Sequence, residues 1–372
     1  MKFKIDEIWI DDEVLDYDLT WKIVERSKAS KTLIGNEYKI EARRIALEPD
    51  PFKRGKRIIR LMRHKGAFVK PCPGTKEYIC CNLEIIHIGQ GCPMDCRYCA
   101  LQFYFNRPVI EIFVNQDELF KELNQYLDES VQPFHRFCTG EFTDSLALDY
   151  LTELSPRLVD FFQNTNKASL EIKTKTNSVE PLKKLKPKGN VVVSFSLNSS
   201  EVSIKDEIRA ATLNERLVAA SAMEKSGYRL GFHFDPIIPL GDWKQAYAKT
   251  ISAIFDNVST QSIAWISLGV IRFQPVLKDI VTSRFGPVAY FHEAFNTGLD
   301  GKSRLFIDRR VDVYRFMAET IRKRSSDARI YLCMESTEVW EKSLGITMNS
   351  NEQLSRYLDQ AFTNRPEDGQ SR

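Results

Sequence analysis

The sequence predicts an α/β protein whose parallel sheet closes fully or partly into a barrel. From residue 83 onward, short β-prone runs alternate with longer amphipathic stretches, and this strand-then-helix order recurs about six times. The 372-residue chain is 43% apolar and 28% charged, which is the composition of a folded globular protein rather than a disordered or fibrous one. We therefore expect the chemistry to lie at the carboxyl ends of the strands.

The expected strands are rich in β-branched and aromatic residues and end near turn-forming residues. In chain order they are Leu83–Ile88, Arg136–Cys138, Ser169–Lys173, Asn190–Leu197, Leu230–Phe234, Ser262–Leu268 and Ile330–Met334. The clearest helices carry apolar residues at three- and four-residue spacing. They are Asp117–Leu127, Leu146–Phe162, Leu213–Ser226 and Lys244–Phe255.

Residues 1–80 are expected to form an N-terminal basic extension, because charged and aromatic residues alternate there without a clear period. Within it, the segment from Lys39 to Lys70 holds eleven basic and three acidic residues, a local charge of +8, while the other 340 residues sum to −5. Such a segment attracts a polyanion such as nucleic acid. A solvated helix face explains the same charges, and the sequence leaves both interpretations open.

Residues 81–335 cover the expected barrel, and a hairpin is expected within it at about 288–310. The signal for the hairpin is Asp300-Gly301 between two β-prone stretches. Residues 336–372 are expected to form a C-terminal helix followed by a disordered polar tail. Together these regions give a barrel with an N-terminal extension and a C-terminal hairpin and helix region.

The start of the chain carries acidic residues where a signal peptide would be apolar, and no later run approaches the ~18 apolar residues of a membrane span. We therefore expect a cytoplasmic protein with no membrane partner. Eight cysteines are too few for a disulfide scaffold in a chain of this length. Clustered cysteines in a reducing compartment favour metal or redox chemistry instead.

Three cysteines lie within eight residues directly after the first expected barrel strand. Cys92, Cys96 and Cys99 stand on a loop that begins with glycines, so they can surround one metal centre. Three thiolates on a four-iron cluster leave one iron open for a further ligand. A zinc site completed by Cys80, Cys81 or a histidine is the alternative.

The C-x3-C-x2-C spacing, with Tyr98 before the last cysteine, resembles the signature of the radical S-adenosylmethionine (radical SAM) superfamily. The resemblance implies a partial or full (β/α) barrel of the radical SAM type. It also implies that Cys92, Cys96 and Cys99 hold a [4Fe–4S] cluster whose fourth iron binds SAM. Reductive cleavage of that SAM would give methionine and a 5′-deoxyadenosyl radical.

Further pieces resemble the spore photoproduct lyase branch, in the same order from about residue 80 to residue 335. They are Cys99-Ala100-Leu101-Gln102, Phe113-Val114-Asn115, Thr174-Lys175, Ser196-Leu197-Asn198, Gly227–Phe232 and Gly298–Lys302. The resemblance implies that Thr139-Gly140-Glu141 meets the SAM amino group. It also implies that Lys175 and Ser196 hold the SAM carboxylate; the residues themselves leave an ordinary helix-start lysine and a structural serine as alternatives.

Cys138 ends the second expected strand and resembles the cysteine that donates hydrogen to the product radical in these lyases. A thiol suits this role because its S–H bond is weak, although a buried structural cysteine would look the same in the sequence. Tyr98 resembles a tyrosine of the radical relay. Ala100 departs from the family, because the best-known lyases carry a second tyrosine at that position.

Several polar residues are candidates for substrate binding near the barrel mouth. His233 and Asp235 end an expected strand and could bind a nucleobase edge, or they could be a core histidine and a turn residue. Arg272 is a candidate for a phosphate contact. The hairpin adds Lys302 and Arg304.

The resemblance implies a DNA-repair lyase that reverts 5-thyminyl-5,6-dihydrothymine to two thymines. Its cofactors would be a [4Fe–4S] cluster and SAM, and its partners would be DNA with a thymine-dimer lesion and an electron donor such as flavodoxin or ferredoxin. Two alternatives remain at this point. One is a radical SAM enzyme acting on RNA, a peptide or a small molecule, and the other is a non-enzymatic, metal-containing nucleic-acid-binding protein.

Overall fold

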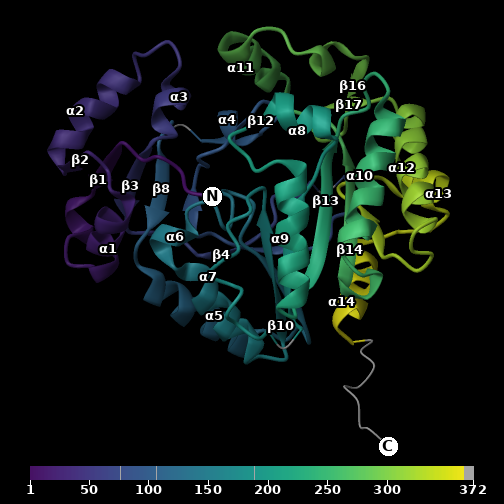
Figure 1. The fold of residues 1–372 in the computed structure, drawn as a ribbon, viewed down its shortest axis with the longest axis horizontal. Coiled ribbons are helices and arrows are strands. Elements are labelled where there is room, and N and C mark those ends of the chain that lie inside the picture. The colour runs from purple at the N-terminus through teal and green to yellow at the C-terminus, as the bar shows by residue number, and fades with distance from the viewer. Residues whose placement is uncertain (76, 106, 188, 364–372) are drawn as a thin grey trace, which may run out of the picture.

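A computed structural model describes residues 1–75, 77–105, 107–187 and 189–363. Its largest element is an eight-stranded sheet in the order β18-β14-β13-β11-β10-β9-β5-β4. All neighbouring strands are parallel except β4 and β5. The sheet is curled but open, with β18 and β4 at its edges among the described residues, so the expected barrel is a partial one (Figure 1).

Each expected barrel strand is present, which confirms the alternation read from the sequence. The strands are β5 (Glu84–Ile86), β9 (His135–Cys138), β10 (Ala168–Thr174), β11 (Val191–Ser196), β13 (Arg229–Ile237), β14 (Ile263–Val270) and β18 (Ile330–Leu332), with β4 (Val69–Pro71) added at one edge. Of the helices between them, α5 (Gln116–Glu129), α9 (Leu213–Lys225) and α10 (Trp243–Asn257) confirm the predictions.

The helix expected over residues 146–162 is wrong as a single element. The structure has α6 (Asp149–Thr152) and α7 (Leu154–Gln163), joined at Glu153, whose φ is +51°. The Asp149 carboxylate accepts hydrogen bonds from the backbone N–H and the hydroxyl of Ser155. These bonds satisfy the start of α7 and let the chain turn at Glu153, which an apolar pattern alone does not reveal.

The two faces of the sheet differ in polarity, and this difference positions the site. Leu170 and Ile172 of β10 join the same core cluster as Leu158 and Phe162 of α7. The alternate residues point to the concave face, where Glu171 pairs in register with Cys138 of β9. Further registers on this face join Lys173 to Ser194 and Ser196 to His233. The concave face of the sheet is therefore lined with polar and titratable side chains.

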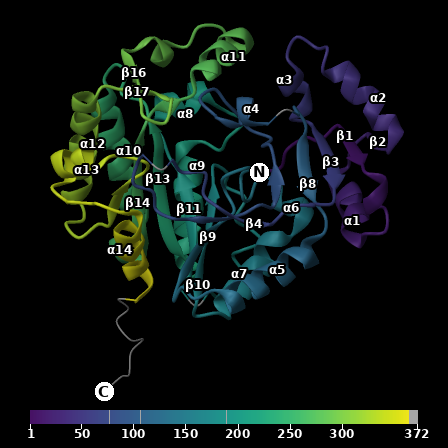
Figure 2. The same cartoon turned by 180° about the vertical axis from the view of Figure 1, so that it is seen from behind.

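The N-terminal region contributes a second sheet, which the sequence pattern did not predict. Its five strands run in the order β2-β1-β3-β8-β6, and Figure 2 shows it opposite the C-terminal helices. The strands are β1 (Glu7–Ile10), β2 (Lys31–Ile34), β3 (Ile58–Met62), β6 (Gly89–Gln90) and β8 (Ile110–Phe113), with α1 (Asp18–Ser27), α2 (Asn36–Ile45), α3 (Pro51–Gly55) and the short turn η1 (Asp12–Val14). Two strands of this sheet, β6 and β8, come from the region after residue 80. The expected boundary between the N-terminal extension and the barrel, at residue 80, remains a prediction.

Most cations of the basic segment that lie in or next to β3 have acidic partners. Arg54 and Arg57 bind Asp6, and Arg60 binds Asp11 through two of its nitrogens. The exposed cations of this segment lie elsewhere, on α2 and α3 and in the loop after β3. They are Lys39, Arg43, Arg44, Lys53 and Lys65, the last of which forms an ion pair with Glu13. The segment is therefore partly an internal charge network and partly a solvated helix face.

The expected hairpin is confirmed as β16 (Phe295–Thr297) and β17 (Ser303–Leu305), which pairs with β15 (Arg272–Phe273). The remaining elements are β7 (Asp95–Cys96), α4 (Leu101–Tyr104), α8 (Ser200–Asp206), β12 (Glu207–Ile208), η2 (Thr260–Ser262), α11 (Pro275–Phe285), η3 (Ala289–His292), α12 (Ile307–Arg322), α13 (Thr337–Leu344) and α14 (Asn351–Thr363). The C-terminal helix is thus a pair, α13 and α14. The expected disordered tail, 364–372, lies outside the described residues.

No helix in the part of the chain that the structure describes has the length and apolar character needed to cross a bilayer.

We predict that Gly231→Ala destabilises the protein by about 1–3 kcal/mol, the usual cost of overpacking a core. A Cβ at Gly231 would lie 2.1 Å from Ser194 Oγ and 2.8 Å from Trp265 Nε1, on the crowded concave face. Chemical denaturation measures the effect. The double variant Gly231→Ala/Ser194→Ala, which removes the nearest atom, should recover part of the loss; an undiminished loss would mean that the Ser194 contact is not its cause.

Candidate active site

The carboxyl ends of the central strands bring the predicted site residues together on the concave face. Cys138 ends β9, is fully buried, and its Sγ accepts a hydrogen bond from the Gly140 N–H at 3.3 Å. Burial raises the pKa of the Cys138 thiol, and the nearby Lys173 ammonium opposes this only in part. The group therefore stays a protonated thiol over the ordinary pH range.

The loop with the three remaining predicted cysteines leaves β6 and is held by short pairings. In β7, Cys96 pairs with Glu207 of β12, and the Cys99 N–H donates to the Cys96 carbonyl at 3.1 Å. Cys96 belongs to a small buried cluster against which Cys92 and Cys99 also pack. The loop therefore gathers the three thiols in one place.

Burial raises the pKa of each of these thiols, and the Lys56 ammonium acts in the opposite direction on Cys92 and Cys99. Among the described residues, no three His, Cys, Asp or Glu side chains converge on one point that could hold a single ion. An iron–sulfur cluster asks for a different arrangement, because each thiolate binds a different iron. The donor set, three thiols on one loop with cations beside them, fits such a cluster.

Cys80 and Cys81, the proposed completing ligands of a zinc site, have other neighbours. Cys80 is hydrogen-bonded to Cys72 and Cys81. The groups that act on Cys96 are instead Lys175, Glu207 and the other two loop cysteines. The structure therefore does not support the zinc alternative with these ligands.

Lys175 and Tyr98 meet at Glu207, a residue that sequence reasoning missed. The Tyr98 hydroxyl donates to Glu207, and the Lys175 ammonium lies 3.2 Å from the same carboxylate and 5.6 Å from the Tyr98 ring centre. Arg216, also fully buried, binds Glu207 from the other side and donates to the Ser196 carbonyl at 2.7 Å. Burial alone would raise the pKa of Glu207, but the charges of Lys175 and Arg216 lower this pKa to about 2. Lys175 and the Ser196 carbonyl are thus linked through the Glu207–Arg216 ion pair.

The Thr139-Gly140-Glu141 turn packs against Lys173. The Thr139 hydroxyl donates to Ser145 Oγ at 2.6 Å, and Glu141 forms an ion pair with Lys173. A Cβ at Gly140 would lie 2.7 Å from the Lys173 Cβ and 3.0 Å from its carbonyl oxygen, so the close approach requires glycine. Lys173, which alternates with apolar residues in β10, is a site neighbour that its polarity in that strand could have signalled.

The other concave-face candidates already have partners. His233 lies 2.6 Å from Glu171, and although burial alone would raise the pKa of Glu171, its interactions with the His233 side chain and with Lys173 lower that pKa to about 2. Asp235 and Arg272 form an ion pair at 3.3 Å, and Arg272 also donates to Cys333 Sγ at 3.3 Å. His233, Asp235 and Arg272 thus already have polar partners within the protein, and a direct contact of each with substrate remains a prediction.

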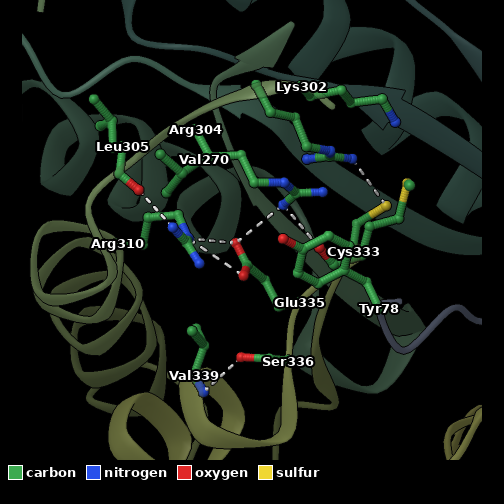
Figure 3. A network of polar contacts seen from close by, with 12 residues as sticks. Tyr78, Val270, Lys302, Arg304, Leu305, Arg310, Cys333, Glu335, Ser336 and Val339 are labelled. Atoms are coloured by element: carbon green, nitrogen blue, oxygen red, sulfur yellow. Dashed lines mark hydrogen bonds and ion pairs between the residues drawn. The ribbon is translucent and has the colours of Figure 1, made fainter. Parts of the chain in front are cut away.

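Arg304 is only 1% exposed, and Figure 3 shows it at the centre of a buried network. Its guanidinium lies 3.9 Å from the ring centre of Tyr78, 2.7 Å from Asp300 Oδ2 and 3.9 Å from Glu335 Oε1. Arg304 therefore anchors the hairpin to the sheet. Lys302, at 3.3 Å from the same Asp300 oxygen, is the more accessible of the two predicted hairpin cations.

A family model described as spore photoproduct lyase matches residues 3–291. The chain is 28% identical over 203 residues to the spore photoproduct lyase of Geobacillus sp. (strain Y412MC61) and 31% identical over 163 residues to that of Bacillus subtilis (strain 168). These matches cover 54% and 44% of this chain, and 60% and 48% of the relatives. The chain thus spans about half to three-fifths of the curated relatives it matches.

Solved structures extend the comparison to the fold. A spore photoproduct lyase variant with bound AdoMet and dinucleoside spore photoproduct matches with a TM-score of 0.79 and 20% identity, over 89% of this chain and 100% of that chain. A lyase complexed with dinucleoside spore photoproduct matches with a TM-score of 0.78 and 21% identity over the same shares. At this identity the likeness establishes the shared fold.

We predict that Cys92→Ser, Cys96→Ser and Cys99→Ser each lose most of the iron bound after anaerobic reconstitution, because each removes one thiolate ligand. Cys333→Ser is the matched control and should keep the iron content of the unmodified protein. Iron and sulfide analysis measures both. Zinc without iron in the unmodified protein, or full iron in Cys96→Ser, would contradict the assignment.

Proposed function

The chain belongs to the spore photoproduct lyase family, and on this premise we propose that it is a radical SAM lyase that reverts 5-thyminyl-5,6-dihydrothymine to two thymines. The observation that carries the proposal is the buried, protonated Cys138 thiol at the end of β9. Its strand, β9, pairs with β10, which Lys175 follows, and Lys175 contacts Glu207 beside the cysteine loop. A hydrogen-atom donor must be a thiol rather than a thiolate, and burial favours that form.

The cofactors of the family fit residues of this chain. Cys92, Cys96 and Cys99 would hold the [4Fe–4S] cluster. Lys175 and Ser196 would hold the carboxylate of SAM, and Thr139-Gly140-Glu141 would meet its amino group. When both are bound, the reduced cluster and SAM supply the 5′-deoxyadenosyl radical that abstracts hydrogen from C6 of the lesion.

The residues of the chain would then perform the remaining steps. After the methylene bridge breaks, the Cys138 S–H bond breaks and a C–H bond forms on the thymine allyl radical, which leaves a thiyl radical on Cys138. Tyr98, whose hydroxyl donates to Glu207, is the proposed relay: its O–H hydrogen would restore the thiol, and the phenoxyl radical so formed would take a hydrogen atom from the methyl group of 5′-deoxyadenosine. Ala100 carries no phenol, so this chain would have one relay tyrosine here rather than two.

Binding of the lesion would require its extrusion from the duplex, which costs less at a damaged step. The outward-facing cations of α2 and the Lys302 hairpin are the proposed backbone contacts, together with Arg272, while His233 and Asp235 are the proposed base contacts. Arg54 and Arg57 are less suited to a DNA contact, since both bind Asp6. A small one-electron carrier such as flavodoxin or ferredoxin is the proposed reductant, and a cytoplasmic location remains a prediction.

We predict that Cys138→Ala still cleaves SAM but no longer releases normal repaired product, because the radical has lost its hydrogen donor. The assay uses iron-reconstituted protein with SAM, dithionite and a synthetic spore-photoproduct dinucleotide. Chromatography follows thymidylyl-thymidine and 5′-deoxyadenosine. Cys333→Ser serves as the thiol control and should repair normally.

The same assay separates the alternatives. Repair together with SAM cleavage in the unmodified protein establishes the lyase. Deoxyadenosine without repair would move the substrate to another molecule. Normal repair by Cys138→Ala would remove Cys138 from the mechanism.

We predict that Arg43→Glu/Arg44→Glu weakens DNA binding and lowers its salt slope by about 1–2, since each lost phosphate contact removes about 0.9 from the slope. Both residues are exposed on α2. The control is Lys249→Glu/Lys323→Glu, which makes the same change of charge at exposed sites on α10 and at the end of α12. Filter binding or fluorescence anisotropy at several salt concentrations measures both. Equal slopes for the two double variants would exclude α2 as the DNA contact.

A further inference from the structure

Lys56 reaches from the end of α3 into the cysteine loop. Its ammonium donates to the carbonyl of Cys92 at 3.1 Å and to the carbonyl of Met94, and it lies 3.5 Å from Asp95 Oδ1. The side chain is only 11% exposed. An ammonium has three N–H donors, and here three acceptors of one loop surround it. The Lys56 ammonium is therefore directed to the cysteine loop rather than to DNA or solvent.

A second cation holds the same loop from the other side. Arg284 of α11 binds Asp95 through both guanidinium ends, at 3.0 and 2.9 Å, and it also binds Asp50 just before α3 at 2.9 Å. Gln102 accepts from Arg284 and donates to the Cys96 carbonyl at 2.9 Å. Figure 1 shows α3, α4 and α11 at the same end of the molecule. Segments more than 180 residues apart in the sequence thus meet at this loop.

We propose that Lys56 is a positioning residue for the cluster-binding loop, which it fixes from the N-terminal region while Arg284 fixes it from α11, and that its charge favours the reduced form of the bound cluster. The electrostatic part of this proposal rests on the proposed function, because it requires a bound cluster. The positioning role follows from the contacts alone.

The electrostatic part follows from a difference of charge. Reduction adds one electron to the cluster, and a buried cation stabilises the more negative state. Lys56, Arg284, Asp95 and Asp50 together carry no net charge. Arg209 is the further cation near Asp95 and Cys92. Replacing Lys56 with a neutral residue therefore makes the net charge around the cluster one unit more negative, whatever its starting value.

The positioning part follows from the orientation of the carbonyls. The carbonyls of Cys92 and Met94 both point to one ammonium, which fixes the backbone on both sides of Pro93. Partners that orient metal ligands commonly change metal affinity about 10–100-fold when removed. We therefore expect Lys56 to act on the thiols through the backbone rather than by touching the substrate.

The test compares Lys56→Gln, which removes the charge, with Lys56→Arg, which keeps it, and with Lys53→Gln, an exposed residue of the same helix. Two readouts are used. Hydrogen exchange of residues 89–99 in the iron-free protein measures the positioning, and an EPR-monitored redox titration of the reconstituted protein measures the potential. Circular dichroism checks that each variant is folded.

We expect faster exchange of residues 89–99 in Lys56→Gln. We also expect an about tenfold lower ratio of reduced to oxidised cluster at a fixed potential, which is a downward shift of about 59 mV for one electron. Lys56→Arg should keep the potential, and Lys53→Gln should match the unmodified protein in both readouts. If Lys56→Gln does not fold, Arg284→Lys, which keeps its charge but loses the two-point contact, should increase exchange with little change in potential.

Unchanged exchange and unchanged potential in folded Lys56→Gln would overturn the proposal. An equal shift in Lys53→Gln would overturn it as well, because the effect would then be unspecific. Failure of the unmodified protein to bind a cluster would refute the proposed function instead, and the exchange measurement on the iron-free protein would still decide the positioning role.

Discussion

The buried ion pair of Arg216 and Glu207 organises the candidate site. Both side chains are fully buried, and an unpaired charge at such a depth would be very unfavourable. Glu207 pairs through its backbone with Cys96 and binds Tyr98 and Lys175 through its carboxylate. Arg216 adds the carbonyl of Ser196. One ion pair thus joins the cysteine loop to the carboxyl ends of two barrel strands.

The same requirement, that each buried charge has a partner, accounts for much of the polar concave face. Glu171 has His233, Glu141 has Lys173 and Asp235 has Arg272. Burial among these groups raises the pKa of the Cys138 thiol, so that it remains protonated. The apolar face of the same strands packs under the helices. Because side chains alternate along each strand, the residues that stabilise the core lie on one face of the sheet and the candidate site residues lie on the other.

The charged N-terminal region combines two roles that a count of charges does not distinguish. Arg54, Arg57 and Arg60 bind acidic residues of β1 and its flanks and hold the second sheet together. Lys56, between them in sequence, turns instead to the cysteine loop. The exposed cations of the segment are those of α2, Lys53 of α3 and Lys65 after β3. In the hairpin, Arg304 is likewise buried, and it connects the hairpin to Tyr78 and Glu335.

The sequence by itself determined the succession of strands and helices and a parallel sheet closed fully or partly into a barrel, and it singled out the three-cysteine loop and Cys138, because these depend on local periodicity and on spacing along the chain. It also indicated the hairpin through Asp300-Gly301. The break at Glu153 and the N-terminal sheet depended on side-chain capping and on pairing between β3 and β8, which are about fifty residues apart. Glu207, Arg216 and Lys56 were identified as neighbours of the site only in the tertiary structure. Their roles come from partners distant in sequence. The sequence alone does not distinguish a charged residue that faces water from one that binds a buried carboxylate.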